Sequence, residues 1–298
     1  MPNEEFTPYG YFDTLKRVAR LGADYPFLKT ALVGKSVMGK DISAIIFGRA
    51  SEYVLFAGGF HGSEHITATL LLKFAEELAS ALATDDSIEG LRVRRAMYGR
   101  GLIIIPAVNP DGCEISRFGA AATDGGRFLR RISGGDFTHF NANARGVDIN
   151  HNFDADWENL RERERAAGIT GPSKTRFGGF SPESEPETAA LCKLCRSINL
   201  RHAVAFHSQG EVIYPPSGEK KPPRSDRMAE IMAASSGYLI DEPDGLAVGG
   251  GFKDWFIKEF NRPAFTVEVG LGENPLPLSD YPKIYSRIRE LLMLTAIM

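Results

Sequence analysis

The sequence predicts an α/β fold, a three-layer α/β/α sandwich with helices on both faces of a mixed, mostly parallel sheet. Short apolar runs alternate along the 298 residues with stretches of helical periodicity. Several of these runs are apolar at every position, which is typical of strands buried on both faces of a sheet. The composition, 43% hydrophobic and 24% charged, is that of an ordinary globular protein. We therefore expect a single α/β domain over residues 1–298.

The expected elements are bounded by glycine, proline or polar clusters. The expected strands cover residues 28–33, 41–47, 53–57, 102–106, 203–206 and 264–268. The expected helices cover residues 10–22, 66–83, 184–198, 225–236 and 280–296. Residues 107–112 carry a strong turn signal, and residues 215–223 form a loop rich in proline, glycine and lysine.

Residues 113–180 differ from the rest of the chain. They are rich in glycine, asparagine, aspartate and arginine and show little periodicity. A loop of this length is uncommon in a compact domain unless it has a function. We therefore expect this segment to contribute to a functional site.

Composition and charge exclude several classes of partner. The formal net charge is −3, so there is no basic surplus to indicate nucleic acid or an anionic membrane. No apolar run approaches the ~20 residues of a membrane span. Residues 1–5 lack the charged and apolar regions of a signal peptide, which predicts a cytoplasmic location unless a leader has been removed. The oligomeric state is left open.

The three cysteines do not indicate a thiolate metal site. Cys192 and Cys195 are spaced two residues apart in a helical stretch, and no second pair accompanies them. Two semi-buried thiols on a helix are favoured over a redox pair.

Polar side chains follow four of the expected strands. His61 and Glu64 follow the strand at 53–57, and Asp111 follows the strand at 102–106. His207 and Glu268 come at the ends of the strands at 203–206 and 264–268. In parallel α/β folds, sites lie beyond the carboxyl ends of the strands. The coincidence of four such strand ends predicts a common site there.

His61, Glu64 and His207 are the predicted metal ligands. Two ring nitrogens and one carboxylate oxygen are what a catalytic zinc site requires, with one position left open. The His61–Glu64 spacing taken alone is a weak motif, because such residues also cap helices. Together with His207 it predicts a metallohydrolase with one Zn²⁺ per chain.

Two further carboxylates have candidate roles. Asp148 could accept a hydrogen bond from a zinc-bound histidine and fix the orientation of its ring, or it could be an ordinary turn aspartate. Glu268, flanked by apolar residues, is either paired in the core or catalytic. Catalysis is favoured, because a carboxylate beside a metal-activated water can take its proton and pass it to the leaving amine.

Three arginines lie in the segment 126–131, which reads GRFLRR. An arginine aimed at the oxyanion of amide hydrolysis would supplement the metal. Any one of Arg127, Arg130 and Arg131 could have this role. The others could bind substrate carboxylates or simply be solvated.

With these motifs, the chain resembles the zinc carboxypeptidase family. The matching segments, in chain order, are HGSE at 61–64, NPDG at 109–112, RFLR at 127–130, GVDIN at 146–150, HS at 207–208 and TVE at 266–268. They cover about residues 8 to 296. The resemblance implies a mixed eight-stranded sheet, Arg130 as the oxyanion arginine and Glu268 as the general base.

Within this family, the chain is most similar to the bacterial γ-D-glutamyl-diamino acid peptidases. The segments that carry this similarity are 140–145, 207–214 and 265–277. The resemblance implies cleavage of peptidoglycan stem peptides between γ-D-glutamate and meso-diaminopimelate or lysine. Because we find no prosegment, peptidoglycan-binding repeat or secretion signal, we expect recycling of muropeptides in the cytoplasm. It leaves three alternatives: an ordinary C-terminal carboxypeptidase, a deglutamylase, or an inactive binding module that kept the fold.

Substrate binding is where this chain departs from the family pattern. Asn150 and His151 stand where the family has Asn-Arg, an arginine that anchors a substrate carboxylate. His151 is shorter and only partly charged near neutral pH. We expect Asn150 and His151 to bind a carboxylate, with Arg127, Arg145 or Lys253 as replacements for the missing arginine. Glu273 and Asn274 are expected to recognise the diaminopimelate side chain.

The glycine-rich segment at 247–252 is the second departure. Digestive carboxypeptidases carry a mobile tyrosine in this region, and this chain has none there. Phe252 cannot donate a hydrogen bond in its place.

Overall fold

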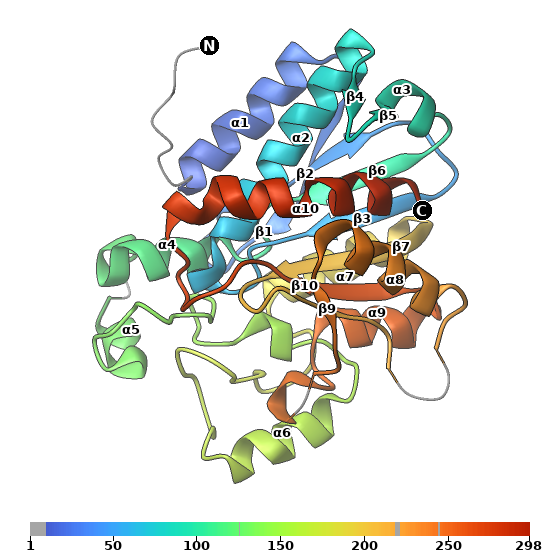
Figure 1. The fold of residues 1–298 in the computed structure, drawn as a ribbon. Coiled ribbons are helices and arrows are strands. Elements are labelled where there is room, and N and C mark those ends of the chain that lie inside the picture. The colour runs from blue at the N-terminus through green and yellow to red at the C-terminus, as the bar shows by residue number, and fades with distance from the viewer. Residues whose placement is uncertain (1–9, 125, 218–220, 244) are drawn as a thin grey trace.

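The computed structural model describes residues 10–124, 126–217, 221–243 and 245–298 (Figure 1). Residues 1–5, in which no signal peptide was expected, lie outside these ranges, as do residues 218–220 of the expected loop. An eight-stranded sheet crosses the molecule in the order β1-β2-β6-β3-β7-β10-β8-β9. Its strands are β1 (Lys29–Lys35), β2 (Asp41–Phe47), β3 (Tyr53–Ala57), β6 (Gly101–Ile105), β7 (Leu200–His207), β8 (Val212–Tyr214), β9 (Leu239–Ile240) and β10 (Ala264–Glu268).

The four central strands, β6, β3, β7 and β10, are neighbours and run parallel. Strands β1 and β2 on one side, and β8 on the other, pair antiparallel to their inner neighbours. The mixed eight-stranded sheet that the family resemblance implies is therefore confirmed. Parallel neighbours end at one edge of the sheet, so the residues that follow β6, β3, β7 and β10 meet there.

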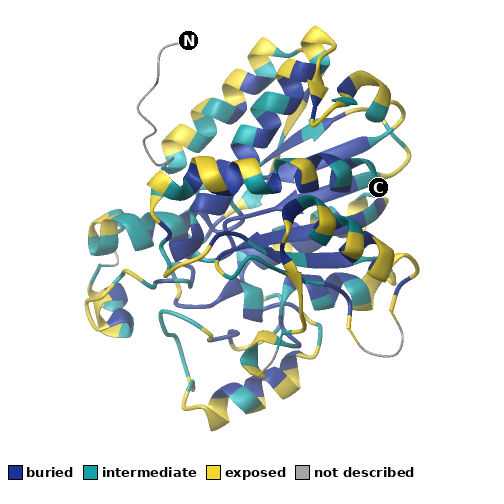
Figure 2. Cartoon of the chain, in the orientation of Figure 1, coloured by how far each residue is buried: buried dark blue, intermediate teal, exposed yellow. Residues whose placement is uncertain are grey.

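Helices cover both faces of the sheet (Figure 1). The long helices are α1 (Tyr11–Asp24), α2 (Ile66–Thr84), α7 (Pro186–Ser197), α8 (Ser225–Ser236), α9 (Phe252–Phe260) and α10 (Tyr281–Ile297). Alternate residues of each strand point to opposite faces. One face packs with α1, α2, α8 and α10 into a large core, and the other packs with α7 and α9. Figure 2 shows the buried sheet between these two layers.

The segment at 113–180 is more ordered than its sequence predicts. It contains most of α4 (Pro110–Phe118), then α5 (Gly126–Ser133) and α6 (Trp157–Ala166), together with the 3₁₀ turns η2 (Gly119–Ala122) and η3 (Ile149–His151). The expected turn at 107–112 begins α4, because Asn109 accepts a hydrogen bond from the Gly112 N–H and Pro110 occupies the first turn. The same residue types favour turns and helix starts.

Several short elements were also not predicted. They are β4 (Ser87–Ile88), β5 (Leu91–Arg92), α3 (Val93–Ala96), the 3₁₀ turns η4 (Gly245–Ala247) and η5 (Leu278–Asp280), and the edge strands β8 and β9. Helix α9 was missed as well. It follows directly on a run of three glycines, where the sequence offers no capping residue.

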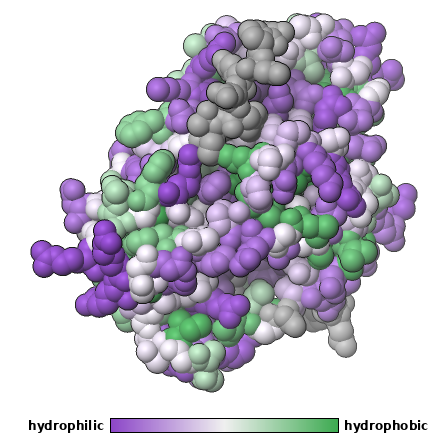
Figure 3. Space-filling model, turned by 60° about the vertical axis from the view of Figure 1, so that its left-hand side comes forward, coloured by the Kyte–Doolittle hydropathy of each residue, from purple (hydrophilic) through white to green (hydrophobic). Residues whose placement is uncertain are grey.

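The cysteines are free thiols, and Cys192 and Cys195 are buried on α7 in the core beneath the sheet. Burial raises the pKa of both thiols. They are therefore inert packing residues, as the favoured interpretation of their spacing predicts. Among the described residues, no helix has the length and apolar character needed to cross a bilayer. Figure 3 shows a mostly hydrophilic face with separate small hydrophobic patches.

Candidate active site

The segment that carries His61 and Glu64 leaves β3 at the carboxyl edge of the sheet. It forms a single 3₁₀ turn, η1 (Gly62–Glu64), before α2 begins. At Gly62 a side chain is impossible, because a Cβ atom would collide with the carbonyl oxygens of Gly112 and Phe140. This tight packing fixes the turn, and the turn directs both side chains toward the end of β7, where His207 lies.

His61, Glu64 and His207 come together in one buried cluster. Their ligand atoms all lie within 4.8 Å of one another. The Glu64 carboxylate contacts both rings, with Oε1 2.8 Å from His61 Nδ1 and Oε2 2.9 Å from His207 Nδ1. The two Nδ1 atoms are 3.3 Å apart. The three residues predicted as metal ligands thus form one candidate metal site.

This cluster fits a zinc ion by its donor set and its geometry. Two imidazole nitrogens and one carboxylate are a catalytic zinc set, and all three point at one small volume. The His207 ring stacks on Phe60, with 5.1 Å between centroids, which holds its Nδ1 toward the other two ligands. Two Nδ1 atoms facing each other at 3.3 Å, with a carboxylate between them, are arranged for a shared cation.

The electrostatics of the cluster follow from its burial and its charges. Burial disfavours ionised Glu64, but His61 and His207 outweigh this effect and lower its pKa to about 2. Burial likewise opposes a charged His61, but Glu64 and Asp148 raise the pKa of its ring well above the ordinary value. Burial lowers the pKa of His207, which keeps that imidazole neutral. An ionised Glu64 and a neutral His207 are the forms that bind a metal.

Asp148 joins this cluster to the segment at 113–180. Its Oδ1 lies 3.1 Å from His61 Nε2, the ring nitrogen that faces away from the other ligands. Its carboxylate also accepts the backbone N–H groups of Asn150, at 3.2 Å, and of Arg176, at 2.9 Å. The pKa of Asp148 is lowered, because the pull of His61 and His151 and the Arg176 N–H outweigh burial. Asp148 is therefore placed to orient the His61 ring.

Glu268 ends β10 directly beside His207, its register partner on β7. Its carboxylate has no hydrogen-bond or ion-pair partner among the described residues, so it is not the paired core carboxylate that the sequence left open. Burial and the charge of Glu64 raise its pKa well above the ordinary value, against a smaller opposing effect of His61. A carboxylate with a raised pKa beside a metal site can exchange protons with a substrate.

Arg127 and Arg130 lie three residues apart on α5, and both are exposed. Together with Ala120, Thr123 and Phe128 they line an open depression of about 560 Å³. Arg131, on the same helix, lies over the Phe128 ring at 5.5 Å. Arg127 and Arg130 are therefore the two cations of α5 that share an accessible hollow.

Asn150 and His151 occupy different environments. The Asn150 side chain is partly exposed, and its Oδ1 accepts the Phe252 N–H at the start of α9. The His151 ring is buried, with Nδ1 2.8 Å from Glu164 Oε1. Burial lowers the pKa of His151, so the ring is neutral near pH 7. These contacts favour a supporting role for His151 behind Asn150, not the direct contact with a carboxylate that was expected.

Glu273 and Asn274 lie in the loop between β10 and α10, and Asn274 contacts Ser208, the residue after the ligand His207. The Asn274 Nδ2 donates to the Ser208 carbonyl at 2.6 Å, and its Oδ1 accepts from the Ser208 hydroxyl at 2.8 Å. Asn274 thus braces the residue after His207. Glu273 is 87% exposed and lies 3.4 Å from His139, which leaves its carboxylate accessible.

Asp111 does not face the site, although its position after a central strand suggested that it would. It is fully buried, and its oxygens accept from the Lys40 Nζ and the Met38 N–H, both at 2.8 Å. It therefore ties α4 to the turn between β1 and β2. Nothing in the sequence marks Lys40 as its partner.

Four residues of the site were missed from the sequence: Phe60, Asn141, Ser208 and Arg176. Phe60 stacks on His207, and the Ser208 N–H donates to Glu64 at 3.3 Å. Asn141 accepts from the Ser63 hydroxyl at 2.6 Å. Phe60 is a direct neighbour of the predicted ligand His61. Ser208 and Asn141 lie in the segments 207–208 and 140–145, which carry the family resemblance, but their contacts were not predicted. Arg176 gave no signal.

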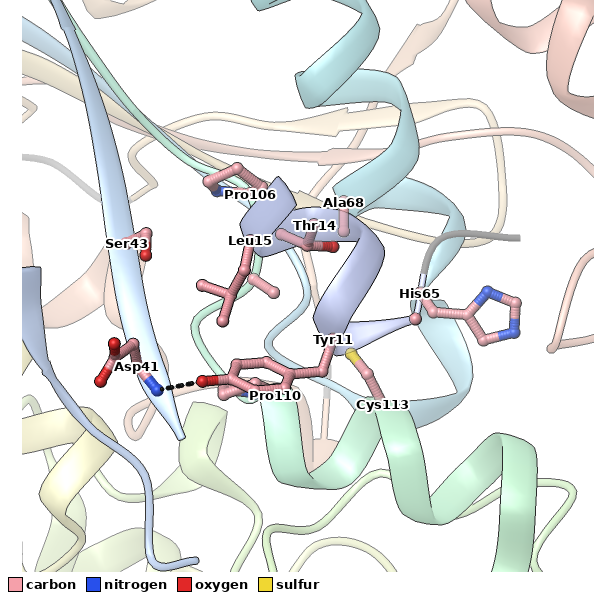
Figure 4. A pocket seen from close by; sticks show the side chains of 12 residues that line it. Tyr11, Thr14, Leu15, Asp41, Ser43, His65, Ala68, Pro106, Pro110 and Cys113 are labelled. Atoms are coloured by element: carbon pink, nitrogen blue, oxygen red, sulfur yellow. Dashed lines mark hydrogen bonds between the residues drawn. The ribbon is translucent and has the colours of Figure 1, made fainter. Parts of the chain in front are cut away.

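A small apolar pocket lies behind the metal-binding turn, between α1, β2, α2 and α4 (Figure 4). Its volume of about 20 Å³ is room for about one water molecule. Tyr11 crosses it, and the Tyr11 hydroxyl accepts the Asp41 N–H at 2.8 Å. Burial raises the pKa of the adjoining Cys113 thiol to about 12, so it is not a nucleophile. The chemistry of the molecule lies at the metal cluster instead.

Comparisons with known proteins agree with this site. A family model described as zinc carboxypeptidase matches residues 15–287. The "Gamma-D-glutamyl-L-diamino acid endopeptidase 1" of Lysinibacillus sphaericus is 35% identical over 281 residues, which are 93% of this chain and 69% of that protein. The "Murein peptide amidase A" of Escherichia coli K12 is 27% identical over 240 residues, 79% of this chain and 78% of that one.

Solved structures share the fold. Bovine thrombin-activatable fibrinolysis inhibitor, in complex with tick carboxypeptidase inhibitor, aligns with a TM-score of 0.76 at 16% identity, over 97% of this chain and 96% of that one. The murein-tripeptide amidase MpaA of Escherichia coli O157 aligns with a TM-score of 0.55 at 22% identity, over 89% and 91%. The family match covers nearly the whole chain and includes every residue of the metal cluster. The chain belongs to the zinc carboxypeptidase family and is a zinc metallopeptidase.

Proposed function

We propose that this enzyme hydrolyses the amide bond between γ-D-glutamate and a diamino acid, meso-diaminopimelate or lysine, in peptidoglycan stem peptides. The observation that carries peptide hydrolysis is the cluster of His61, Glu64 and His207 with the unpaired Glu268 beside it. The substrate class is supported by the 35% identity with the endopeptidase of Lysinibacillus sphaericus, which extends over most of both chains.

Glu268 is the proposed general base and acid. It takes a proton from the attacking water as the water oxygen bonds to the carbonyl carbon. It then gives that proton to the amide nitrogen, the C–N bond breaks, and an amine and a carboxylic acid leave. When bound by His61, Glu64 and His207, zinc supplies a Lewis acid that polarises the carbonyl and makes water more acidic.

Glu268 suits this role because its carboxylate has no partner within the part of the chain that the structure describes. An ion pair would hold its carboxylate in the charged state, whereas this carboxylate can accept and return a proton. Its position in register with His207 places it at the same sheet edge as the metal ligands. No other described carboxylate combines these two properties.

Arg130 is the proposed oxyanion stabiliser, and its guanidinium would pair with the oxygen on which negative charge develops. Its exposed position on α5 leaves the guanidinium available to substrate. Arg127, one helical turn away in the same hollow, is proposed to bind a substrate carboxylate. The partly exposed side chain of Asn150 is proposed to hydrogen bond to substrate, held in place by the Phe252 N–H.

Glu273 and Asn274 are proposed to face the diamino acid. The exposed Glu273 carboxylate could pair with the side-chain amine that diaminopimelate and lysine share, and Asn274 holds this loop against Ser208. We propose that residues 1–298 act as one catalytic domain with one zinc per chain. We also propose a cytoplasmic setting, which the three free thiols support.

The test is a substrate panel with defined bonds. Zinc-loaded enzyme is incubated with L-Ala-γ-D-Glu-meso-diaminopimelate, with its lysine analogue, and with ordinary α-linked peptides that end in a free carboxylate, and products are identified by mass spectrometry. We expect release of the diamino acid, loss of cleavage with a chelator, and recovery on adding zinc. Cleavage of the α-linked peptides alone would show an ordinary carboxypeptidase. Binding without cleavage in any sample would show an inactive module.

A further inference from the structure

A residue other than those predicted is a candidate for anchoring the substrate, and it is linked to the metal cluster through Asp148. His151 stands at the position where the family carries an arginine, but its ring is buried and its Nδ1 is occupied by Glu164. Of the three expected replacements, Arg127 faces the hollow on α5 that it shares with Arg130. Arg145 lies 3.6 Å from the buried Glu185, and the buried Lys253 ammonium bonds to Asp254 at 2.5 Å. Both cations already have a carboxylate partner.

Asp148 links Arg176 to the metal ligand His61. One oxygen of the Asp148 carboxylate contacts the His61 ring, and the other accepts the Arg176 N–H at 2.9 Å. The Asp148 N–H in turn donates to the Phe177 carbonyl at 2.8 Å. The segments around Asp148 and Arg176 are thus tied side by side, and a single carboxylate lies between the Arg176 backbone and the His61 ring.

The side chains of Arg176 and its neighbour Phe177 have opposite surroundings. Phe177 is fully buried and packs under the Arg161 guanidinium, 4.5 Å from its ring centroid. Arg176 is exposed, and its guanidinium has no hydrogen bond or ion pair among the described residues. An exposed arginine that has no partner among the described residues, and whose backbone is bonded to Asp148, is available to a bound anion.

The backbone of Arg176 has a φ of +65°, in the left-handed region that residues other than glycine rarely adopt. Such conformations are retained where the surrounding structure holds them, often at functional sites. Here the bond to Asp148 holds it. The charge of Arg176 also acts on the buried His151, because it helps to lower the pKa of that ring, after the larger effects of burial and of His61.

We propose that Arg176 binds the free α-carboxylate of the residue on the leaving side of the scissile amide, in place of an arginine at position 151. Its guanidinium presents donors in a fork that matches a carboxylate. The proposal rests on the proposed function, because it assumes that this enzyme cleaves a bond next to a residue with a free carboxylate. It adds a specificity-determining residue that no sequence motif indicated.

The experiment compares two versions of one substrate. The zinc-loaded enzyme is assayed on L-Ala-γ-D-Glu-meso-diaminopimelate with a free α-carboxylate on the diaminopimelate and on the corresponding α-amide. The variants are Arg176→Gln, Arg176→Lys, and Arg165→Gln as a matched control. Arg165 is an exposed arginine of α6, and we place it outside the substrate site.

We expect Arg176→Gln to raise the KM for the free carboxylate by about 10- to 100-fold, with kcat changed by less than about threefold. The KM for the amide should stay the same, so the preference for the carboxylate is lost. Arg176→Lys should recover part of it, because the charge remains and the fork is lost. Arg165→Gln should behave as the wild type.

An unchanged preference in Arg176→Gln would overturn the proposal. A fall in kcat without a rise in KM, or loss of zinc from the variant, would also overturn it, because either result assigns Arg176 a catalytic or structural role. If the wild type cleaves no γ-glutamyl substrate, the proposed function fails by itself. The same comparison on an α-linked peptide and its amide then still tests Arg176.

Discussion

The metal centre and the segment at 113–180 are built in different ways. His61, Glu64, His207 and Glu268 follow neighbouring parallel strands, so the register of the sheet fixes their positions. The candidate oxyanion arginine, Arg130, and the candidate substrate-binding residues Arg127 and Asn150 lie on a short helix and a 3₁₀ turn. In the proposed mechanism the sheet therefore supplies the metal ligands and the general base, while the segment beside it supplies the oxyanion arginine and the contacts with substrate.

The largest expected effect on catalysis comes from substituting Glu268. Glu268→Gln removes the proton acceptor but keeps the size of the side chain, so we expect kcat to fall by about 10³-fold or more. The zinc content, measured by elemental mass spectrometry, should stay at one zinc ion per chain, because Glu268 is not one of the proposed ligands. Glu242→Gln, at an exposed carboxylate, is the matched control. Full activity in Glu268→Gln would break the assignment of chemistry to the sheet edge.

Arg130→Ala tests whether the irregular segment takes part in the chemical step. Loss of an oxyanion partner should lower kcat by about 10²- to 10³-fold, with little change in KM. Arg131→Ala is the control on the same helix, because the Arg131 side chain lies over Phe128. A rise in KM with normal kcat would instead make Arg130 a substrate-binding residue and sharpen the division between the two regions.

Asp148 lies at the junction of the two regions. Asp148→Asn leaves a neutral partner for His61, and we expect zinc affinity to fall by about 10- to 100-fold. Competition with a zinc-sensitive dye measures this change. Wild-type affinity in the variant would show that the sheet alone orients the ligands.

Glu187 lies at a second contact between the irregular segment and the rest of the fold. Its substitution should have a smaller effect, which depends on pH. It accepts hydrogen bonds from the Val37 N–H and from Asn143 of the irregular segment. Burial raises its pKa from 4.5 to about 7, with a contribution from Asp111. The folded protein keeps the proton that the unfolded chain loses above pH 4.5, so this group's contribution to stability is lost as pH rises through 7.

Glu187→Gln does not titrate, so its stability relative to the wild type should improve by about 2 kcal/mol between pH 5 and pH 7. Urea denaturation at several pH values measures the difference, with Glu158→Gln, at an exposed carboxylate of α6, as the control. A difference that does not change with pH would show that Glu187 is ionised in the folded protein.

The same contrast explains what the sequence could predict. Apolar strands followed by His61, His207 and Glu268 are a local pattern, and the geometry of a parallel sheet brings such strand ends together. The environment of His151 depends on Glu164, which comes from α6, a helix with few apolar positions. Asp111 pairs with Lys40 from another part of the chain, and no periodicity marks that contact. Long-range pairs between polar residues of irregular segments leave no local signal.

Zinc titration of the metal-free enzyme tests the central claim most directly. Zinc is added in steps to a known concentration of chain while the rate of hydrolysis of L-Ala-γ-D-Glu-meso-diaminopimelate is followed. The account predicts no activity without metal and a linear rise that ends at one zinc per chain. Full activity before zinc is added, or a rise that ends at two zinc ions per chain, would contradict the single site formed by His61, Glu64 and His207.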